Sequence, residues 1–221
     1  MTAIAELHIE DTVRAETARL LFEKECKFVA GANNIDVLPF SESPEIAFAG
    51  RSNVGKSSLL NALTRQTRLA RTSQTPGRTQ QINFFDLSGK LMLVDLPGYG
   101  YARASRSRIK GWNKLIHQYL RGRPNLMRVC LLIDSRHGLK NNDEMLMVEL
   151  DKAAVIYQII LTKCDKTSAA KRQSIISNLI KTFPQHPAAH TSILETSAAK
   201  GDGLIKLRKE LAALAVSAKF G

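Results

Sequence analysis

Short apolar runs alternate with longer segments of helical periodicity from about residue 46 to residue 215. The runs have the length of buried strands, and the longer segments repeat apolar residues every three or four positions. We expect strands over residues 46–49, 81–85, 91–94, 129–134, 154–161 and 192–196. We expect helices over residues 58–64, 112–120, 142–152, 168–183 and 203–215, the last with Leu204, Leu207, Leu211 and Leu214 on one face. This alternation predicts an α/β fold with a mostly parallel, six-stranded sheet and helices on both of its faces.

The second and third strands are joined by a turn at Ser88-Gly89, which is typical of a hairpin and makes one strand antiparallel. The first part of the chain has a different pattern. Residues 11–27 place Val13, Thr17, Leu20 and Leu21 at helical spacing, with only Thr17 breaking the apolar stripe, and residues 28–44 are rich in turn-forming residues. We therefore expect an N-terminal extension with one helix (1–27), a single domain (28–217) and a short tail (218–221).

The charge balance favours a polyanionic partner. The 221 residues carry a formal net charge of +12, and much of the excess is clustered. One cluster consists of Arg65, Arg68, Arg71 and Arg78, and the other of Arg103, Arg106, Arg108, Lys110 and Lys114. Nucleic acid is the polyanion that such clusters most often bind. We expect no membrane partner, because no basic amphipathic helix with an aromatic face is evident.

The compartment is indicated by the cysteines and by the first residues. Cys26, Cys130 and Cys164 are scattered and odd in number, which is typical of a reducing compartment. The first ten residues carry acidic side chains and no basic segment, unlike a signal peptide. No run of about 18 apolar residues is present. We therefore expect a cytoplasmic protein, and we expect it to be a monomer.

A glycine-bounded loop between the first strand and the first helix of the domain predicts a phosphate-binding site. The loop consists of Gly50, Arg51, Ser52, Asn53, Val54, Gly55, Lys56 and Ser57. Glycines let such a loop curl, so that successive N–H groups point at phosphate oxygens and the helix dipole adds to their field. We expect Lys56 to reach the terminal phosphates and the Ser57 hydroxyl to bind Mg²⁺.

The choice of base is predicted by the end of the fifth strand. Thr162, Lys163, Cys164 and Asp165 follow that strand. The Asp165 carboxylate can accept hydrogen bonds from the guanine N1–H and 2-amino group, a donor pair that adenine lacks. The Lys163 stem can pack along the base. The sixth strand ends at Thr196, Ser197, Ala198 and Ala199, whose backbone N–H groups can face guanine O6.

Two further segments can respond to the γ-phosphate. Asp95, Leu96, Pro97 and Gly98 end a strand. Asp95 can hold a water molecule of Mg²⁺, and the Gly98 N–H can contact the γ-phosphate. In the upstream loop a threonine can complete the Mg²⁺ shell, and Thr72, Thr75 and Thr79 are alternatives on sequence grounds. Because both segments contact only the γ-phosphate end, hydrolysis would release them.

These motifs resemble those of the EngB (YihA/YsxC) family of ribosome-assembly GTPases, which belong to the translation-factor-related, Ras-like P-loop NTPases. The resemblance rests on Gly50–Ser57, on Thr-Pro-Gly-Arg-Thr-Gln at 75–80, on Asp-Leu-Pro-Gly-Tyr-Gly-Tyr-Ala at 95–102 and on Thr162–Asp165. It runs from about Phe28 to the C-terminal helix. It implies that the upstream loop contacts nucleotide and Mg²⁺ through Gly77, Arg78, Thr79, Gln80 and Gln81, with Thr79 as the metal ligand. It also implies a role in assembly of the large ribosomal subunit, contact with its precursor and ribosomal RNA, and a link to cell division and septation.

The resemblance predicts catalysis by Lys56, Thr79 and Gly98, with slow intrinsic turnover. Ras-like enzymes place a water-orienting Gln after Asp-x-x-Gly, and this chain has Tyr99 there. In related GTPases the residue equivalent to Asn53 helps to hold a K⁺ ion that replaces an arginine finger, and we expect the same here. An alternative is a ribosome-associated GTP sensor that hydrolyses little without its partner. A P-loop kinase would not explain Asp165.

Overall fold

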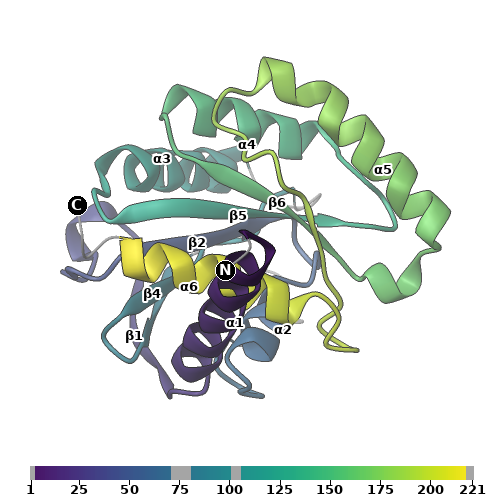
Figure 1. The fold of residues 1–221 in the computed structure, drawn as a ribbon. Helices are drawn as coiled ribbons and strands as arrows, with labels where there is room; N and C mark the ends of the chain where they lie inside the picture. Colours follow the sequence, from purple (N-terminus) through teal and green to yellow (C-terminus); the bar gives the residue numbers. More distant parts are fainter. Residues whose placement is uncertain (1–2, 71–80, 101–105, 218–221) are drawn as a thin grey trace.

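The computed structural model describes the backbone of residues 3–70, 81–100 and 106–217. The side chains of residues 3–10, 106–110, 112–113 and 217 lie outside this description. In the described part of the chain, a single sheet crosses the molecule between two layers of helices (Figure 1). No helix of that part combines the length and the apolar composition that a membrane span needs.

The sheet has the order β1-β3-β4-β2-β5-β6-β7. Its strands are β1 (Cys26–Ala32), β2 (Glu45–Gly50), β3 (Ile82–Leu87), β4 (Leu91–Asp95), β5 (Leu126–Asp134), β6 (Tyr157–Thr162) and β7 (Leu194–Glu195). Strand β3 runs antiparallel to both β1 and β4, and the remaining pairs are parallel. The predicted fold class, with its hairpin and one antiparallel strand, is confirmed.

The number of strands was predicted wrongly, because the described sheet has seven strands and not six. The additional strand, β1, lies at the edge of the sheet in a region that the sequence predicted to be turn-rich. A bulge between Phe28 and Ala30 interrupts its pairing with β3. Only Cys26 and Ala32, at its two ends, are buried, so the strand lacks the regular alternation of buried and exposed residues by which strands are recognised.

The helices cover both faces of the sheet, as predicted. They are α1 (Ala3–Phe22), α2 (Lys56–Leu63), α3 (Arg106–Gly122), α4 (Asn141–Lys152), α5 (Ala169–Thr182) and α6 (Leu204–Ser217). Helices α1, α2 and α6 share one apolar core with the sheet, whereas α3, α4 and α5 pack on the opposite face (Figure 1). The predicted apolar face of α6 is confirmed: Leu204, Leu207 and Leu211 are buried, and Leu214 packs against them.

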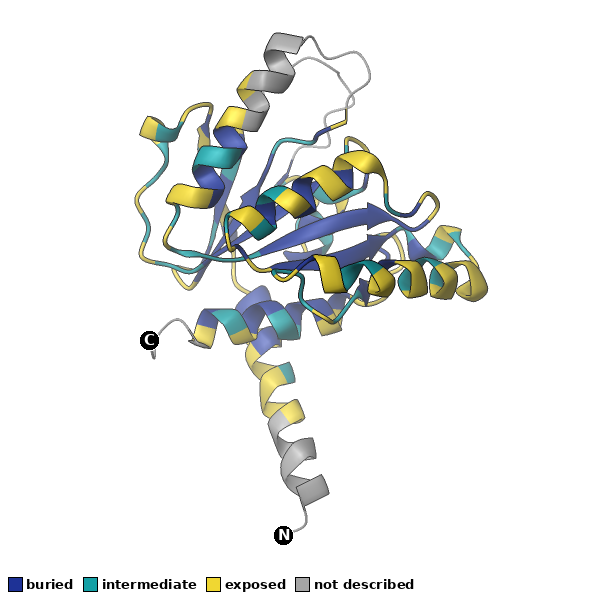
Figure 2. Ribbon diagram, turned by 90° about the horizontal axis from the view of Figure 1, so that it is seen from above, coloured by how far each residue is buried: buried dark blue, intermediate teal, exposed yellow. Residues whose placement is uncertain are grey.

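The predicted face of the N-terminal helix was only partly right. Leu21 is buried as predicted, together with Ala18 and Phe22, but Val13 and Leu20 are exposed. The helix also ends at Phe22 and not at residue 27. Figure 2 shows that burial in the described part of α1 is confined to the end that crosses α6. A helix that crosses its neighbour at one end buries a short patch and not a full-length stripe.

The start of the strand predicted over residues 154–161 was also wrong, because it was placed too early. Strand β6 begins at Tyr157, because Ala153 caps α4 and Ala154 turns the chain with a positive φ of 53°. This exit lets the chain leave α4 and enter the sheet beside β5. Parallel strands β2, β4, β5, β6 and β7 therefore all end at one edge of the sheet, the usual place for ligand binding in such folds.

Candidate functional site

The loop after β2 has the backbone of a phosphate cradle. Asn53 and Gly55 have positive φ angles of 64° and 108°, and the buried Val54 N–H donates to the Arg51 carbonyl at 3.1 Å. A Cβ at Gly50 would lie 2.8 Å from Val54 Cγ1, so only glycine fits there. Helix α2 begins at Lys56 with no side-chain cap, which leaves backbone N–H groups at its first turn to donate to an anion.

The Lys56 ammonium forms an ion pair with the Asp95 carboxylate at the end of β4. Both side chains are 11% exposed, so the contact is largely shielded from solvent. It shows that the loop lysine and the Asp95 motif meet, although they are separated by 39 residues in the sequence. Ser57, the other predicted Mg²⁺ ligand of the loop, follows Lys56 in the first turn of α2.

Gly98 lies against the phosphate loop. A Cβ on Gly98 would lie 3.2 Å from Ser52 Oγ, and the Ser52 N–H donates to the Tyr99 carbonyl at 3.0 Å. In return the Tyr99 N–H donates to the Gly50 carbonyl at 3.3 Å. The segment after Asp95 therefore pairs with the phosphate loop through one parallel bridge between Arg51 and Tyr99. This bridge places Gly98 beside the loop.

The predicted base-binding residues also come together. The Ser197 hydroxyl donates to Asp165 Oδ1 at 2.7 Å, and this bond lowers the pKa of Asp165, so the carboxylate is ionised at neutral pH. The Cys164 N–H donates to the Thr196 carbonyl at 3.1 Å. These two bonds join the segments that follow β6 and β7.

The turn after Thr196 is partly occupied by its own hydrogen bonds. The Ser197 N–H donates to the Asp202 carbonyl at 3.0 Å, and the Lys200 N–H donates to Ser197 Oγ at 3.1 Å. The N–H groups of Ala198 and Ala199, between them, make none of the hydrogen bonds found among the described residues of this turn, so they can donate to a ligand.

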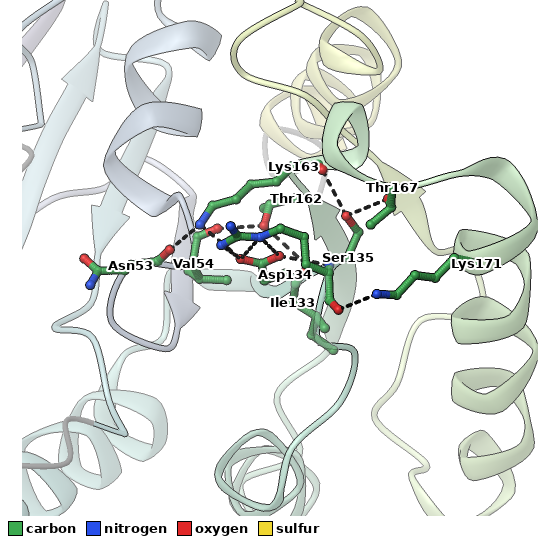
Figure 3. Close-up of polar contacts among 10 residues, drawn as sticks. Asn53, Val54, Ile133, Asp134, Ser135, Thr162, Lys163, Thr167 and Lys171 are labelled. Carbon is green, nitrogen blue, oxygen red and sulfur yellow. Dashed lines mark hydrogen bonds and ion pairs between the residues drawn. The ribbon is translucent and has the colours of Figure 1, made fainter.

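Lys163 connects the segment predicted to bind the base to the phosphate loop (Figure 3). Its Nζ donates to the Asn53 carbonyl at 2.5 Å and lies 3.0 Å from Asp134 Oδ2. The preceding residue, Thr162, donates its hydroxyl to the Val54 carbonyl at 2.7 Å. The end of β6 is thus bonded twice to the loop after β2, and the Lys163 stem spans the distance between them.

Two residues that the sequence did not single out hold Lys163 in place. Asp134 contacts its ammonium, and the Ser135 hydroxyl donates to its carbonyl at 3.0 Å. Lys163 needs this support because its backbone is left-handed, with φ of 57°. Burial alone would raise the pKa of Asp134, but hydrogen bonds from Arg136 and Lys163 hold it well below its usual range. The feature of the sequence that could have identified Asp134 is its position as an acidic residue at the end of the apolar run 129–134.

Part of the predicted site lies outside the described residues. Gly77, Arg78, Thr79 and Gln80 belong to the segment 71–80, which the structure does not describe. Gln81 is exposed and precedes β3, where its side chain lies beside Gly31 of β1. Of the basic clusters, Arg65, Arg68 and Lys114 have side chains that the structure describes, and all three are exposed.

Tyr99 stands where Ras-like enzymes carry the water-orienting Gln, and its side chain is buried. The phenol donates to Asp143 Oδ1 in α4 at 2.7 Å. This contact directs the hydroxyl into the protein.

Comparison with known proteins agrees with this geometry. Residues 45–163 match the family model described as "50S ribosome-binding GTPase". The chain is 54% identical over 212 residues to the "Probable GTP-binding protein EngB" of Rhodospirillum rubrum, with 93% of this chain and 92% of that protein aligned. It is 50% identical over 204 residues to the protein of the same name in Ruegeria pomeroyi, with 92% of this chain and 94% of that protein aligned.

Solved structures share the fold. The crystal structure of a probable GTP-binding protein engB has a TM-score of 0.63 at 22% identity, and the alignment covers 78% of this chain and 99% of that one. Era, crystallised with MgGDPNP and nucleotides 1506–1542 of 16S ribosomal RNA, has a TM-score of 0.59 at 23% identity, covering 79% and 57%. The similarity to these solved structures shows the fold. The sequence relatives and the family model show the family: this chain belongs to the EngB family of GTP-binding proteins.

Proposed function

We propose that this protein binds GTP with Mg²⁺, hydrolyses it to GDP and phosphate, and acts as a switch in assembly of the large ribosomal subunit, and that normal cell division and septation need it. The observation that carries the proposal is the pair of bonds from Lys163 and Thr162 to the phosphate loop. They fix Asp165 and the phosphate loop relative to each other, which is the arrangement that a guanine nucleotide requires.

Each part of the nucleotide has a group that suits it. The ionised Asp165 carboxylate would accept from guanine N1–H and the 2-amino group, and the N–H groups of Ala198 and Ala199 would face O6. The loop N–H groups and Lys56 would hold the phosphates. The Gly98 N–H would contact the γ-phosphate and so distinguish GTP from GDP.

The residues present fit a magnesium ion. Mg²⁺ prefers hydroxyl, carboxylate, water and phosphate oxygens, and the Lys56–Asp95 contact brings a carboxylate to the end of the loop that carries Ser57. Ser57 and Thr79 would be the direct ligands, and Asp95 would hold a bound water. The ion would supply charge stabilisation to the phosphates.

The proposed partner is a precursor of the large ribosomal subunit and its RNA. The description of the matching family model, the net charge of +12 and the exposed arginines Arg65 and Arg68 support this partner. Arg103, Arg106 and Arg108 would contact the RNA and not the nucleotide. We place the protein in the cytoplasm as a monomer.

Co-sedimentation with large ribosomal subunits tests the switch. We expect the protein to sediment with the subunits when it is loaded with a non-hydrolysable GTP analogue and to remain in the supernatant with GDP. Equal sedimentation in both states would contradict a switch, and no sedimentation in either would contradict the partner. Subunits treated with ribonuclease provide the control for the RNA contribution.

A second function, a GTP sensor with negligible hydrolysis in the absence of its partner, is favoured by the position of Tyr99. Its phenol is buried and donates its proton to Asp143, so that proton does not orient an attacking water. Single-turnover hydrolysis with and without large subunits separates the two functions. A measurable rate for the protein alone supports the GTPase, whereas a rate seen only with subunits supports the sensor.

A further inference from the structure

Three parts of the site meet at the buried carboxylate of Asp143. This residue lies in the first turn of α4 and is completely buried. Its Oδ1 accepts the Tyr99 hydroxyl at 2.7 Å, and its Oδ2 accepts the Lys140 N–H at 3.0 Å. Arg51 of the phosphate loop brings its Nε to 3.4 Å from Oδ2. The phosphate loop, the residue after Gly98 and the start of α4 thus share one buried charge.

Tyr99 is fixed at three separate points. Its N–H donates to Gly50, its carbonyl accepts from Ser52, and its hydroxyl donates to Asp143. The side chain as a whole is 7% exposed. A residue held through both its backbone and its side chain cannot rotate without breaking several buried hydrogen bonds.

The chain on the other side of Tyr99 also lies against α4. Gly100 has a positive φ of 71°, and a Cβ there would lie 2.9 Å from Asn142 Nδ2. The close approach shows that the path of the chain past Tyr99 follows the first turn of α4. The orientation of the Gly98 peptide, one residue before this fixed point, therefore depends on the contact between Tyr99 and α4.

We propose that Tyr99 is a positioning residue for γ-phosphate recognition: its bond to Asp143 holds Gly98 so that its N–H faces the γ-phosphate, with Arg51 balancing the buried charge. This inference rests on the proposed binding of GTP. Ras-like enzymes have at this position a Gln that orients the attacking water. This chain has Tyr99, which orients the peptide of the neighbouring Gly98. Because only the γ-phosphate meets Gly98, the bond contributes to GTP binding and not to GDP binding.

The chain contains a closely matched control. Tyr119 of α3 donates its hydroxyl to the buried Glu45 Oε2 at 3.0 Å. An arginine faces each carboxylate, although Arg123 is hydrogen-bonded to Glu45 whereas Arg51 Nε lies 3.4 Å from Asp143. Tyr119 packs in the same apolar core as Tyr99. Glu45, however, starts β2 at the strand end opposite to the phosphate loop. Tyr99→Phe and Tyr119→Phe therefore remove the same kind of hydrogen bond. The first bond lies near the proposed nucleotide site and the second lies far from it.

The test measures the affinities of both full-length variants for GDP and for a non-hydrolysable GTP analogue, together with their thermal unfolding. We expect Tyr99→Phe to weaken binding of the GTP analogue about three- to tenfold with little change for GDP, a loss that corresponds to the net contribution of one ordinary hydrogen bond. We expect Tyr119→Phe to lower the unfolding temperature and to leave the ratio of the two affinities unchanged. Single-turnover hydrolysis should slow in Tyr99→Phe alone.

The outcomes separate this inference from the proposed function. If Tyr99→Phe weakens GTP and GDP equally, or if Tyr119→Phe changes the ratio as much, Tyr99 has only a structural role and the inference is wrong. If the unchanged protein binds neither nucleotide, the proposed function itself is wrong. Should Tyr99→Phe not fold, Asp143→Asn keeps the shape of the partner and must shift the ratio in the same direction.

Discussion

Asp134 and Lys163 form an ion pair of 3.0 Å from the ends of neighbouring strands, and Ser135 bonds the carbonyl of the same lysine. Consecutive residues of one strand end thus hold both the ammonium and the backbone of Lys163. The lysine in turn donates to the Asn53 carbonyl of the phosphate loop. Figure 3 shows this chain of contacts running from β5 through Lys163 to the loop.

Replacing Asp134 with Ala should weaken guanine nucleotide binding. Without the carboxylate, Lys163 loses one of the contacts that keep its stem along the proposed base site. We expect about a three- to tenfold loss of affinity, equal for GDP and GTP because both carry the same base. Equilibrium titration with fluorescent nucleotides measures it. The hydrolysis rate at saturating GTP should change little.

Arg136 provides the control for that variant. Its guanidinium contacts the same Asp134 carboxylate at 2.7 Å but makes no contact with Lys163 among the hydrogen bonds and ion pairs of the described residues. Arg136→Gln should therefore bind both nucleotides nearly as the unchanged protein does. A loss in Arg136→Gln as large as in Asp134→Ala would mean that buried charge, and not the hold on Lys163, sets the affinity.

The same carboxylate should make stability depend on pH. Arg136 and Lys163 hold the pKa of Asp134 below its unfolded value of about 3.9. Its stabilising contribution is therefore present above about pH 4 and is lost as the pH falls towards the folded pKa. Urea unfolding of the protein and of Asp134→Asn should differ by about 1 kcal/mol at pH 7, since solvent screens the half-exposed Arg136, and the difference should narrow below pH 4. A difference that does not vary with pH would contradict this assignment.

The elements that the sequence predicted correctly are those whose residues are buried in a regular pattern. Residues 129–133 of β5 form an unbroken apolar run because helices cover both faces of the sheet at its centre. Strand β1 was missed because its bulge and its edge position remove that pattern. Pattern alone cannot show a strand that is held mainly by backbone pairing with one neighbour.

The residues of the site likewise divide into those that the sequence identifies and those that only the structure reveals. The phosphate loop and Asp165 are local motifs, so their residues can be identified without knowing what lies beside them. The residues that contact Lys163 and Tyr99 cannot be identified in this way. Asp134 meets Lys163 because the register of β5 and β6 places Asp134 opposite Thr162. Asp143 meets Tyr99 from 44 residues away. Such contacts follow from register and helix packing, which the sequence does not display.

Asp165→Asn should change the base that the protein prefers. An amide cannot accept hydrogen bonds from both N1–H and the 2-amino group of guanine, but it can donate to the 2-oxo group of xanthine. We expect GTP affinity to fall about 100-fold or more and xanthosine triphosphate to bind better than GTP. The Ser197 hydroxyl can still donate to the amide oxygen, so the loop should keep its conformation. Competition titration with the two nucleotides measures the change, and unchanged GTP affinity would contradict the assignment of Asp165 to guanine.

Potassium should accelerate hydrolysis through Asn53. Its carbonyl is bound by Lys163, and Figure 3 shows its side-chain amide pointing away from that lysine. An amide oxygen on the phosphate loop suits K⁺, and a cation there would stabilise the charge that develops on the phosphates. We expect single-turnover hydrolysis to be about tenfold faster in KCl than in NaCl at equal ionic strength. Asn53→Gly should abolish the difference without straining the backbone, because glycine accepts the φ of 64° that alanine would not. Equal rates in the two salts, or a K⁺ effect that persists in Asn53→Gly with GDP affinity intact, would show that Asn53 holds no catalytic cation.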